Sequence, residues 1–166
     1  MADLHISWDD YHDAIEHLAQ SVHNSGWQFD QIVCIARGGL RIGDIFSRIF
    51  KLPLAILFTQ SYVEEHGTVR GEITISRHIA MTSERLGERV LLVDDLVDSG
   101  ITLDAVKAHL IKAHPYIREM KAAVLWWKAL SQVHPDYHVA YLTDNPWIHQ
   151  PFERYDLMKA DDLKKV

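Results

Sequence analysis

Two adjacent carboxylates, Asp94 and Asp95, stand directly after an apolar run, and small or hydroxylated residues follow them. The apolar run, residues 90–93, is typical of a strand covered on both faces of a parallel sheet. Because ligands bind at the carboxyl ends of such strands, the two carboxylates are placed to hold sugar hydroxyls or a hydrated Mg²⁺ ion. The small residues are typical of a helix start, where free backbone N–H groups attract phosphate. They are Asp98, Ser99, Gly100, Ile101 and Thr102.

A simpler interpretation of this segment is that Asp98 or Ser99 only caps the helix that follows. Capping explains one residue and leaves the paired carboxylates and the glycine unexplained. The whole set is therefore better explained as a site for a sugar phosphate.

A second charged turn lies earlier in the chain. Residues 31–36 are an apolar run typical of a strand, and Arg37, Gly38 and Gly39 follow it. An arginine followed by two glycines makes a cationic turn with accessible N–H groups, which suits an anionic ligand. The alternative is an ordinary turn between a strand and a helix, with the arginine facing solvent. The presence of the Asp94 run favours the anion-binding interpretation.

Two further segments carry side chains that suit a heteroaromatic ligand. Lys128 follows a strand candidate over residues 119–127, where its ammonium can donate a hydrogen bond to an exocyclic oxygen. Trp147 offers an indole face for stacking, and the backbone near Ile148 can read the edge of a base. Taken separately, Lys128 is more simply a surface charge and Trp147 a packing aromatic. Their order after the Asp94 run favours a base-binding role.

Alternating strands and helices must position these side chains. The alternation predicts an α/β fold, a mainly parallel sheet with helices on both faces. Ser61 and Tyr62 open a polar stretch without periodicity, which predicts a mobile loop up to residue 71. The predicted helices are residues 8–23, a segment after residue 39, and residues 100–113. The predicted strands lie at residues 31–36, 54–58, 72–76, 90–93, 119–127 and 138–142.

The run over residues 90–102 resembles the phosphoribosyl-pyrophosphate (PRPP) signature of the type I phosphoribosyltransferases. Lys128 and the Trp147-Ile148 segment are similar to the bacterial xanthine-guanine branch of that family. The resemblance implies transfer of the 5-phosphoribosyl group from PRPP to guanine, xanthine or hypoxanthine, with release of pyrophosphate, in purine salvage. It also implies Mg²⁺ as the cofactor, the type I fold, and a small hood at roughly residues 137–166 that covers the base.

The resemblance also implies roles for single residues. Asp94 and Asp95 would hold the ribose hydroxyls, with Asp95 reaching the metal, and Asp98 would accept the purine proton. These three are the candidate catalytic residues. Ser61 and Tyr62 resemble the opening of a flexible loop that closes over the site. The base would contact Lys128, Trp147, Ile148 and Glu153. PRPP would contact Arg37, Gly38, Gly39, Asp94, Asp95, Asp98, Ser99, Gly100, Ile101 and Thr102.

Two positions depart from the xanthine-guanine pattern. Ile101 stands where those enzymes have glycine, which alters the shape of the phosphate loop. Glu153 stands where they have aspartate, next to the purine's 2-substituent. The longer acid puts the preference among the three 6-oxopurines in doubt.

Length and composition limit the class of protein. The 166 residues fit one domain, residues 1–166, and the net charge of −6 does not favour binding to nucleic acid. The lone Cys34 excludes an intramolecular disulfide, and the absence of a long apolar segment predicts a cytoplasmic protein without stable membrane insertion. The family implies a homo-oligomer, a dimer or a tetramer. His12 and His17 are spaced unfavourably for a shared metal on one helix face.

Two other functions stay open. A regulatory protein of the same fold that senses PRPP would keep the Asp94 run but needs neither the Arg37 turn nor Lys128 and Trp147, so their presence favours catalysis. The other alternative is a phosphoribosyltransferase for another base, such as a pyrimidine or adenine. Lys128 predicts that adenine is a poor substrate, because an ammonium donates to an oxygen but cannot accept from an amine.

Overall fold

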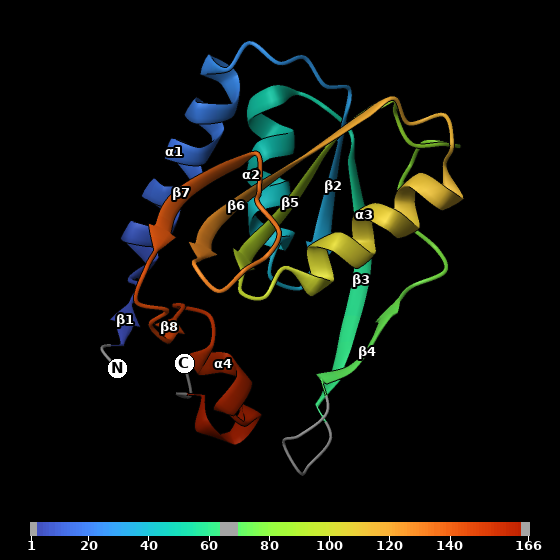
Figure 1. The fold of residues 1–166 in the computed structure, drawn as a ribbon. Helices are drawn as coiled ribbons and strands as arrows, with labels where there is room; N and C mark the ends of the chain where they lie inside the picture. Colours follow the sequence, from blue (N-terminus) through green and yellow to red (C-terminus); the bar gives the residue numbers. More distant parts are fainter. Residues whose placement is uncertain (1–2, 64–69, 164–166) are drawn as a thin grey trace.

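A computed structural model of the chain describes residues 3–63 and 70–163 (Figure 1). Within these residues the main sheet has six strands in the order β4-β3-β2-β5-β6-β7, and β1 and β8 form a second sheet of two strands. Neighbours in the main sheet are parallel except β3 and β4. The strands are β1 (Leu4–His5), β2 (Gln31–Ala36), β3 (Leu54–Val63), β4 (Arg70–Ile75), β5 (Arg89–Val97), β6 (Glu119–Lys128), β7 (Tyr137–Leu142) and β8 (Ile148–His149).

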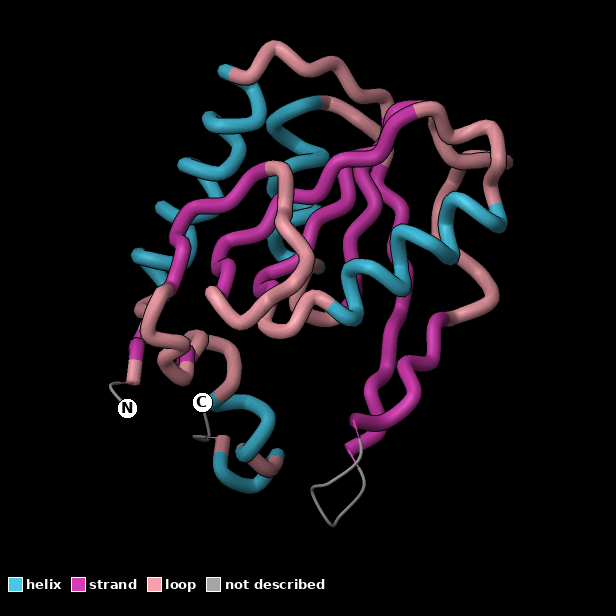
Figure 2. Tube along the Cα trace, viewed as in Figure 1, coloured by secondary structure: helices cyan, strands magenta, loops and turns pink. Residues whose placement is uncertain are grey.

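Helices cover both faces of the main sheet (Figure 2). On one face an apolar cluster joins Ile15 of α1 and Phe46 of α2 to the sheet, and on the other face a second cluster includes Val106 of α3. The predicted α/β fold, a mainly parallel sheet between two helical layers, is therefore confirmed. The helices are α1 (Trp8–Asn24), α2 (Leu40–Phe50), α3 (Ile101–Ala113) and α4 (Arg154–Leu157), followed by a 3₁₀ turn, Ala160–Asp162.

The start of α1 shows how local sequence sets an element. The Ser7 hydroxyl accepts a hydrogen bond of 3.1 Å from the backbone N–H of Asp10, and the Ser7 N–H donates one of 3.1 Å to the Asp10 carboxylate. The Ser7 hydroxyl also donates to the Asp10 carboxylate, and this bond, together with the one from the Ser7 N–H, holds the pKa of Asp10 below its usual value. From this cap onward, apolar residues recur at helical spacing and pack on the sheet. The buried ones are Tyr11, Ala14, Ile15, Leu18, Ala19 and Val22.

The central strands are apolar throughout because both of their faces are covered. Every residue of β2 is buried, as are residues 90–93 of β5. Cys34 lies in β2, and burial together with the nearby Asp94 carboxylate raises the pKa of its thiol to about 12. The thiol is therefore a packing group in the folded protein.

Two predicted boundaries need correction. Ser61 and Tyr62 do not open a loop, because β3 continues to Val63 and Ser61 pairs with Ile73 of β4. Backbone pairing in this antiparallel hairpin overrides the polar composition. Residues 64–69, the rest of the expected loop, lie outside the described residues. Similarly, β5 continues to Val97, so Asp94 and Asp95 occupy the last part of the strand instead of following it.

The segment after the main sheet lies with the start of the chain. Strand β7, which falls inside the region expected as hood, pairs with β6 in the main sheet. Beyond it, β8 pairs in parallel with β1, and Figure 1 shows this pair below the end of β7, with β8 between β1 and α4. We use the word hood for residues 143–163. None of the helices in the described part of the chain has the length and apolar character needed to cross a bilayer.

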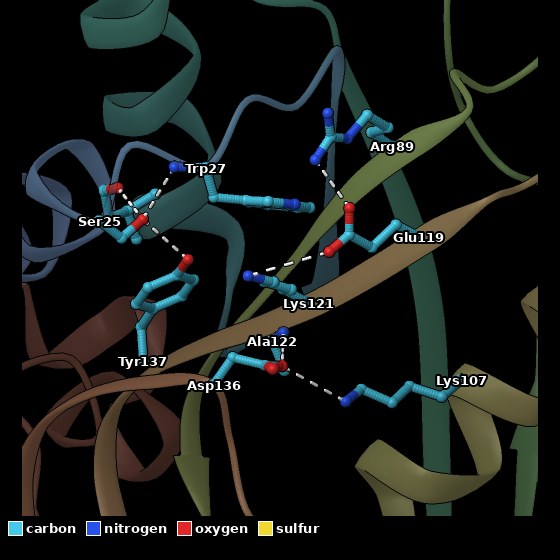
Figure 3. A network of polar contacts seen from close by, with 10 residues as sticks. Ser25, Trp27, Arg89, Lys107, Glu119, Lys121, Ala122, Asp136 and Tyr137 are labelled. Carbon is cyan, nitrogen blue, oxygen red and sulfur yellow. Dashed lines mark hydrogen bonds and ion pairs between the residues drawn. The ribbon is translucent and has the colours of Figure 1, made fainter.

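A network of polar contacts lies at the amino edge of the sheet (Figure 3). Arg89 and Glu119, which begin β5 and β6, are joined by an ion pair of 2.8 Å. Lys121 lies 4.9 Å from the ring centre of Trp27, and the Ala122 N–H donates a 2.7 Å hydrogen bond to Asp136. The residues that line the ligand cleft lie at the opposite, carboxyl edge, where open parallel sheets bind their ligands.

Candidate functional site

A cleft of about 300 Å³ opens at the carboxyl edge of the sheet. The turn after β2 forms one wall, and the end of β5 with the start of α3 forms the other. Thr59 of β3 and Ile73 of β4 also line the cleft, although sequence reasoning did not identify them. Of the residues predicted to bind PRPP, the cleft is lined by Arg37, Gly38, Asp94, Asp95, Asp98, Ser99, Gly100 and Thr102.

The turn after β2 and the end of β5 approach each other closely. A Cβ added to Gly38 would lie 2.4 Å from Oδ1 of Asp95, and one added to Gly39 would lie 2.5 Å from the carbonyl oxygen of Val93. Position 39 therefore requires glycine, because backbone atoms leave no room for a Cβ, whereas a Cβ at Gly38 would force the Asp95 side chain to move. Without a side chain at Gly38 the turn lies against the Asp95 carboxylate, and both predicted motifs line the same cleft.

Asp94 and Asp95 are adjacent carboxylates, so their negative charges repel each other. Asp94 is half-buried, and its Oδ1 accepts a 2.9 Å hydrogen bond from the Asp95 N–H. Burial and the adjacent Asp95 charge raise the pKa of Asp94 well above its usual value. Two carboxylates held together at an open cleft are suited to a bound cation, and their oxygens are the hard ligands that Mg²⁺ prefers. The residues present therefore fit a magnesium ion.

The phosphate loop is shaped by Gly100. Its φ of +85° is in the left-handed region, and a Cβ there would lie 2.6 Å from Cβ of Val133 and 2.7 Å from Oγ of Ser131. Helix α3 then begins at Ile101, whose N–H donates a 3.4 Å hydrogen bond to Oγ of Ser99. The start of a helix of 13 residues thus faces the cleft with a small, hydroxylated loop.

Lys128 and Trp147 come together beside this cleft. Nζ of Lys128 lies 3.4 Å from Oδ1 of Asp98 and 6.0 Å from the centre of the Trp147 ring. The Lys128 side chain is only 9% exposed, whereas the Asp98 side chain is 62% exposed. Trp147 leaves 64% of its surface exposed, so its ring is accessible for stacking. The structure therefore brings together a buried ammonium, an accessible carboxylate and an open aromatic face.

Gln150 is a site residue that sequence reasoning did not identify. Its side chain belongs to the hood, is buried, and donates a 2.5 Å hydrogen bond from Nε2 to Oδ2 of Asp95. Among the described residues its Oε1 has no hydrogen-bond partner although it is buried. The hood is thereby attached directly to the carboxylate pair. Nothing in the local sequence around Gln150 signals a contact with a residue 55 positions away.

Comparison with known proteins identifies the family. The sequence profile described as "Phosphoribosyl transferase domain" matches residues 7–157. The chain belongs to the phosphoribosyl transferase domain family.

Individual relatives agree with this assignment. The chain is 29% identical to a xanthine-guanine phosphoribosyltransferase of Idiomarina loihiensis over 151 residues, covering 90% of this chain and 86% of the relative. A purine phosphoribosyltransferase structure from Pyrococcus horikoshii aligns over 100% of both chains with a TM-score of 0.74 and 28% identity. A xanthine-guanine-hypoxanthine phosphoribosyltransferase from Helicobacter pylori aligns with a TM-score of 0.76 and 23% identity, over 94% of this chain and 96% of that one, and shows the shared fold.

The remaining predicted residues occupy different places in this phosphoribosyl transferase domain. Ile148 is buried in the apolar cluster beside α1, and Glu153 directly precedes the short helix α4 without a capping hydrogen bond from its side chain. Ile101, at 44% exposure, and Gly39 are not among the residues that line the cleft. Arg37 is paired with Asp156 of α4 at 3.1 Å, which gives the hood a second contact with the cleft.

Proposed function

We propose that this phosphoribosyl transferase transfers the 5-phosphoribosyl group of PRPP to a 6-oxopurine in purine salvage, giving the nucleoside 5′-monophosphate and pyrophosphate. The observation that carries the proposal is the shared cleft. It is lined by the Arg37 turn, the Asp94-Asp95 pair and the start of α3, with Lys128 beside Asp98. The names of the Idiomarina loihiensis and Pyrococcus horikoshii relatives support a purine as the acceptor.

PRPP fits the cleft by charge and by shape. The two carboxylates Asp94 and Asp95 accept hydrogen bonds from the ribose hydroxyls, while the N–H groups at the start of α3, with Ser99 and Thr102, hold the 5′-phosphate. Arg37 and the N–H group of Gly38 contact the pyrophosphate, whereas the N–H of Gly39 already donates to the Ile35 carbonyl at 2.8 Å. Arg37 is now paired with Asp156, which is exposed, so the exchange of one anion for another costs little.

Mg²⁺ is the cofactor that we assign to this site, with Asp95 as its candidate ligand. When bound, the ion neutralises charge that develops on the leaving pyrophosphate. Gln150 donates a hydrogen bond to Oδ2 of Asp95, which orients this carboxylate toward its role as a ligand. We therefore assign Gln150 as a positioning residue that acts through Asp95.

The transfer forms a bond between a ring nitrogen of the base and C1′ of the ribose, and it breaks the bond from C1′ to the pyrophosphate oxygen. The proton of the base nitrogen passes to Asp98, the accessible carboxylate beside the cleft. Lys128 donates a hydrogen bond to the 6-oxo group, and Trp147 stacks on the ring. Because Lys128 is paired with Asp98 before the base arrives, entry of the base releases the Asp98 carboxylate to act.

The test is to incubate the purified protein with PRPP, Mg²⁺ and each base in turn while pyrophosphate release is followed. Release with guanine, xanthine or hypoxanthine, and not with adenine or pyrimidines, supports the proposal. Turnover only with adenine or a pyrimidine would replace the base that we assign. Binding of PRPP without turnover for any base would indicate the PRPP-sensing alternative.

Three further properties stay predictions. The sequence predicts one domain over residues 1–166 and a cytoplasmic location, and the family resemblance implies a homo-oligomer. Light scattering of the purified protein measures the last of these directly. A mass of about twice or four times 19.1 kDa is the expected result.

A further inference from the structure

Three side chains that can ligate a metal gather on the small β1–β8 sheet, away from the cleft. Asp3 and His5 are two positions apart, so they project from the same face of the chain where it runs extended. His149 of β8 is the register partner of His5. Pairing of the two strands in parallel therefore brings these three side chains together. Asp3 and His5 both lie before residue 7, where the family match begins.

The geometry of the three groups approaches that of a metal site. Nε2 of His149 lies 3.1 Å from Oδ2 of Asp3, and one ligand atom of each residue lies within 4.8 Å of the others. In a tetrahedral zinc site with ligand distances of about 2.0–2.1 Å, two ligand atoms lie about 3.3 Å apart. The Asp3–His149 pair already has nearly this spacing. The exposed ring of His5 stacks on the ring of His149 with their centres 4.4 Å apart, so it must turn out of this stack to join them.

We propose that Asp3, His5 and His149 form a binding site for Zn²⁺. Two imidazoles and one carboxylate are borderline and hard ligands that suit zinc and not Mg²⁺ or Ca²⁺. The side chains of His149 and Asp3 are 39% and 50% exposed, so the ion has access and water completes its coordination. The proposal does not depend on the reaction assigned to the cleft.

Zinc at this site would connect the start of the chain to the hood. The backbone already joins them, since the Leu4 N–H donates to the Trp147 carbonyl at 2.8 Å and the Ile6 N–H donates to the His149 carbonyl at 3.0 Å. A metal bridging Asp3, His5 and His149 adds a cross-link between the same two strands. The segment that it holds in place carries Trp147.

The test uses tag-free protein freed of metal with EDTA and measures zinc binding by titration calorimetry and thermal unfolding. We expect one zinc ion per chain and a rise in Tm of about 5 °C at saturating zinc. His5→Ala and His149→Ala should each weaken zinc binding about tenfold or more while their Tm in EDTA stays close to that of the wild type. His5 is the more informative position, because it is exposed and its backbone pairing is kept.

A matched control separates this site from the other histidines. His17→Ala removes an exposed histidine of α1 and should leave zinc affinity and the Tm rise unchanged. Mg²⁺ should produce no rise in Tm that is lost in His5→Ala or His149→Ala. Co²⁺ should show visible absorption in the wild type and lose it in His5→Ala. The proposal is overturned if zinc fails to bind at micromolar concentration, or if it binds equally well to the wild type and to both histidine variants.

Discussion

At the scale of single residues, Asp94 carries a cost that only a bound ligand offsets. Its carboxyl is half-buried and adjacent to Asp95, and both effects raise its pKa well above the usual value. Above the ordinary pKa of an aspartate, the unfolded chain releases this proton while the folded chain retains it. Stability therefore falls as the pH rises from about 4, until the folded-state pKa is passed. Functional sites commonly contain such destabilising groups.

We therefore predict that Asp94→Asn stabilises the protein at pH 7 by about 1 kcal/mol, or about 3 °C in Tm, while it weakens PRPP binding. The stabilisation should shrink toward pH 4 and vanish below it, because Asp94 is then protonated in both states. Thermal unfolding from pH 3 to pH 8 in buffer without divalent metal measures this. A variant less stable than the wild type at pH 7 would contradict the argument.

The ion pair between Asp98 and Lys128 predicts coupled effects of mutation. Asp98→Asn leaves the ammonium of Lys128, whose side chain is 9% exposed, without its anion, at a cost of about 1–3 kcal/mol. Lys128→Met removes the buried charge, so adding Asp98→Asn to it should cost about 1 kcal/mol less than it does in the wild type. Urea unfolding of the wild type, the two single variants and the double variant measures this coupling free energy. Strictly additive effects would show that the two groups act independently.

Gln150 gives a prediction on affinity. Gln150→Ala removes the hydrogen bond that orients Asp95, a bond to a charged group worth about 1.5–3 kcal/mol. We expect the KM for PRPP to rise about tenfold, with a smaller change in the KM for the purine. Gln20→Ala, an exposed glutamine of α1, is the matched control. Equal increases in both KM values would indicate a general loss of structure instead of a role at Asp95.

The site residues that the sequence predicts belong to continuous segments with a local pattern, whereas those it does not predict reach the site through long-range contacts. Asp94 and Gly100 were found because they follow one another in a continuous strand, turn and helix, where local rules apply. Gln150 and Asp156 reach the site only through packing of the hood over the sheet. Their contacts join distant parts of the chain, so no local pattern carries them.

At the scale of elements, two glycines that the structure describes in the left-handed conformation allow a direct comparison. Gly26 has φ +71° and nothing within 4 Å of an added Cβ, whereas Gly100 has φ +85° and Val133 at 2.6 Å. We predict that Gly26→Ala costs about 1 kcal/mol, from the backbone conformation alone. Gly100→Ala should cost at least about 1 kcal/mol more, because Val133 and Ser131 must move. Denaturant unfolding measures both.

Only the second substitution should also affect function. Gly100 belongs to the loop before α3, so Gly100→Ala should weaken PRPP binding, while Gly26→Ala at the end of α1 should not. If both variants lost PRPP affinity to the same extent, the effect would come from stability and not from the loop.

Elements with strong periodicity were predictable, and weakly patterned ones were not. Helix α1 and strands β2 and β5 follow from a capping serine, helical spacing and continuous apolar runs. The β1–β8 pair has two residues in each strand, too few to show alternation. The end of β3 is polar, and only its pairing with β4 makes it a strand.

At the scale of the whole molecule, the hood and the sheet meet at the ligand cleft. The hood contributes Trp147 beside Lys128, Gln150 on Asp95, and Asp156 on Arg37. All three contacts fall on residues that we assign to substrate binding. Occupancy of the cleft and the position of the hood are therefore expected to depend on each other.

The central claim is that this cleft joins PRPP to a 6-oxopurine. The most direct measurement is the amount of nucleoside 5′-monophosphate formed from PRPP, Mg²⁺ and guanine, xanthine or hypoxanthine, together with the pyrophosphate released. The account predicts equal amounts of both products with at least one of these bases, and a rate reduced about 100-fold or more in Asp98→Asn. Absence of nucleotide with all three bases, in protein that binds PRPP, would contradict it.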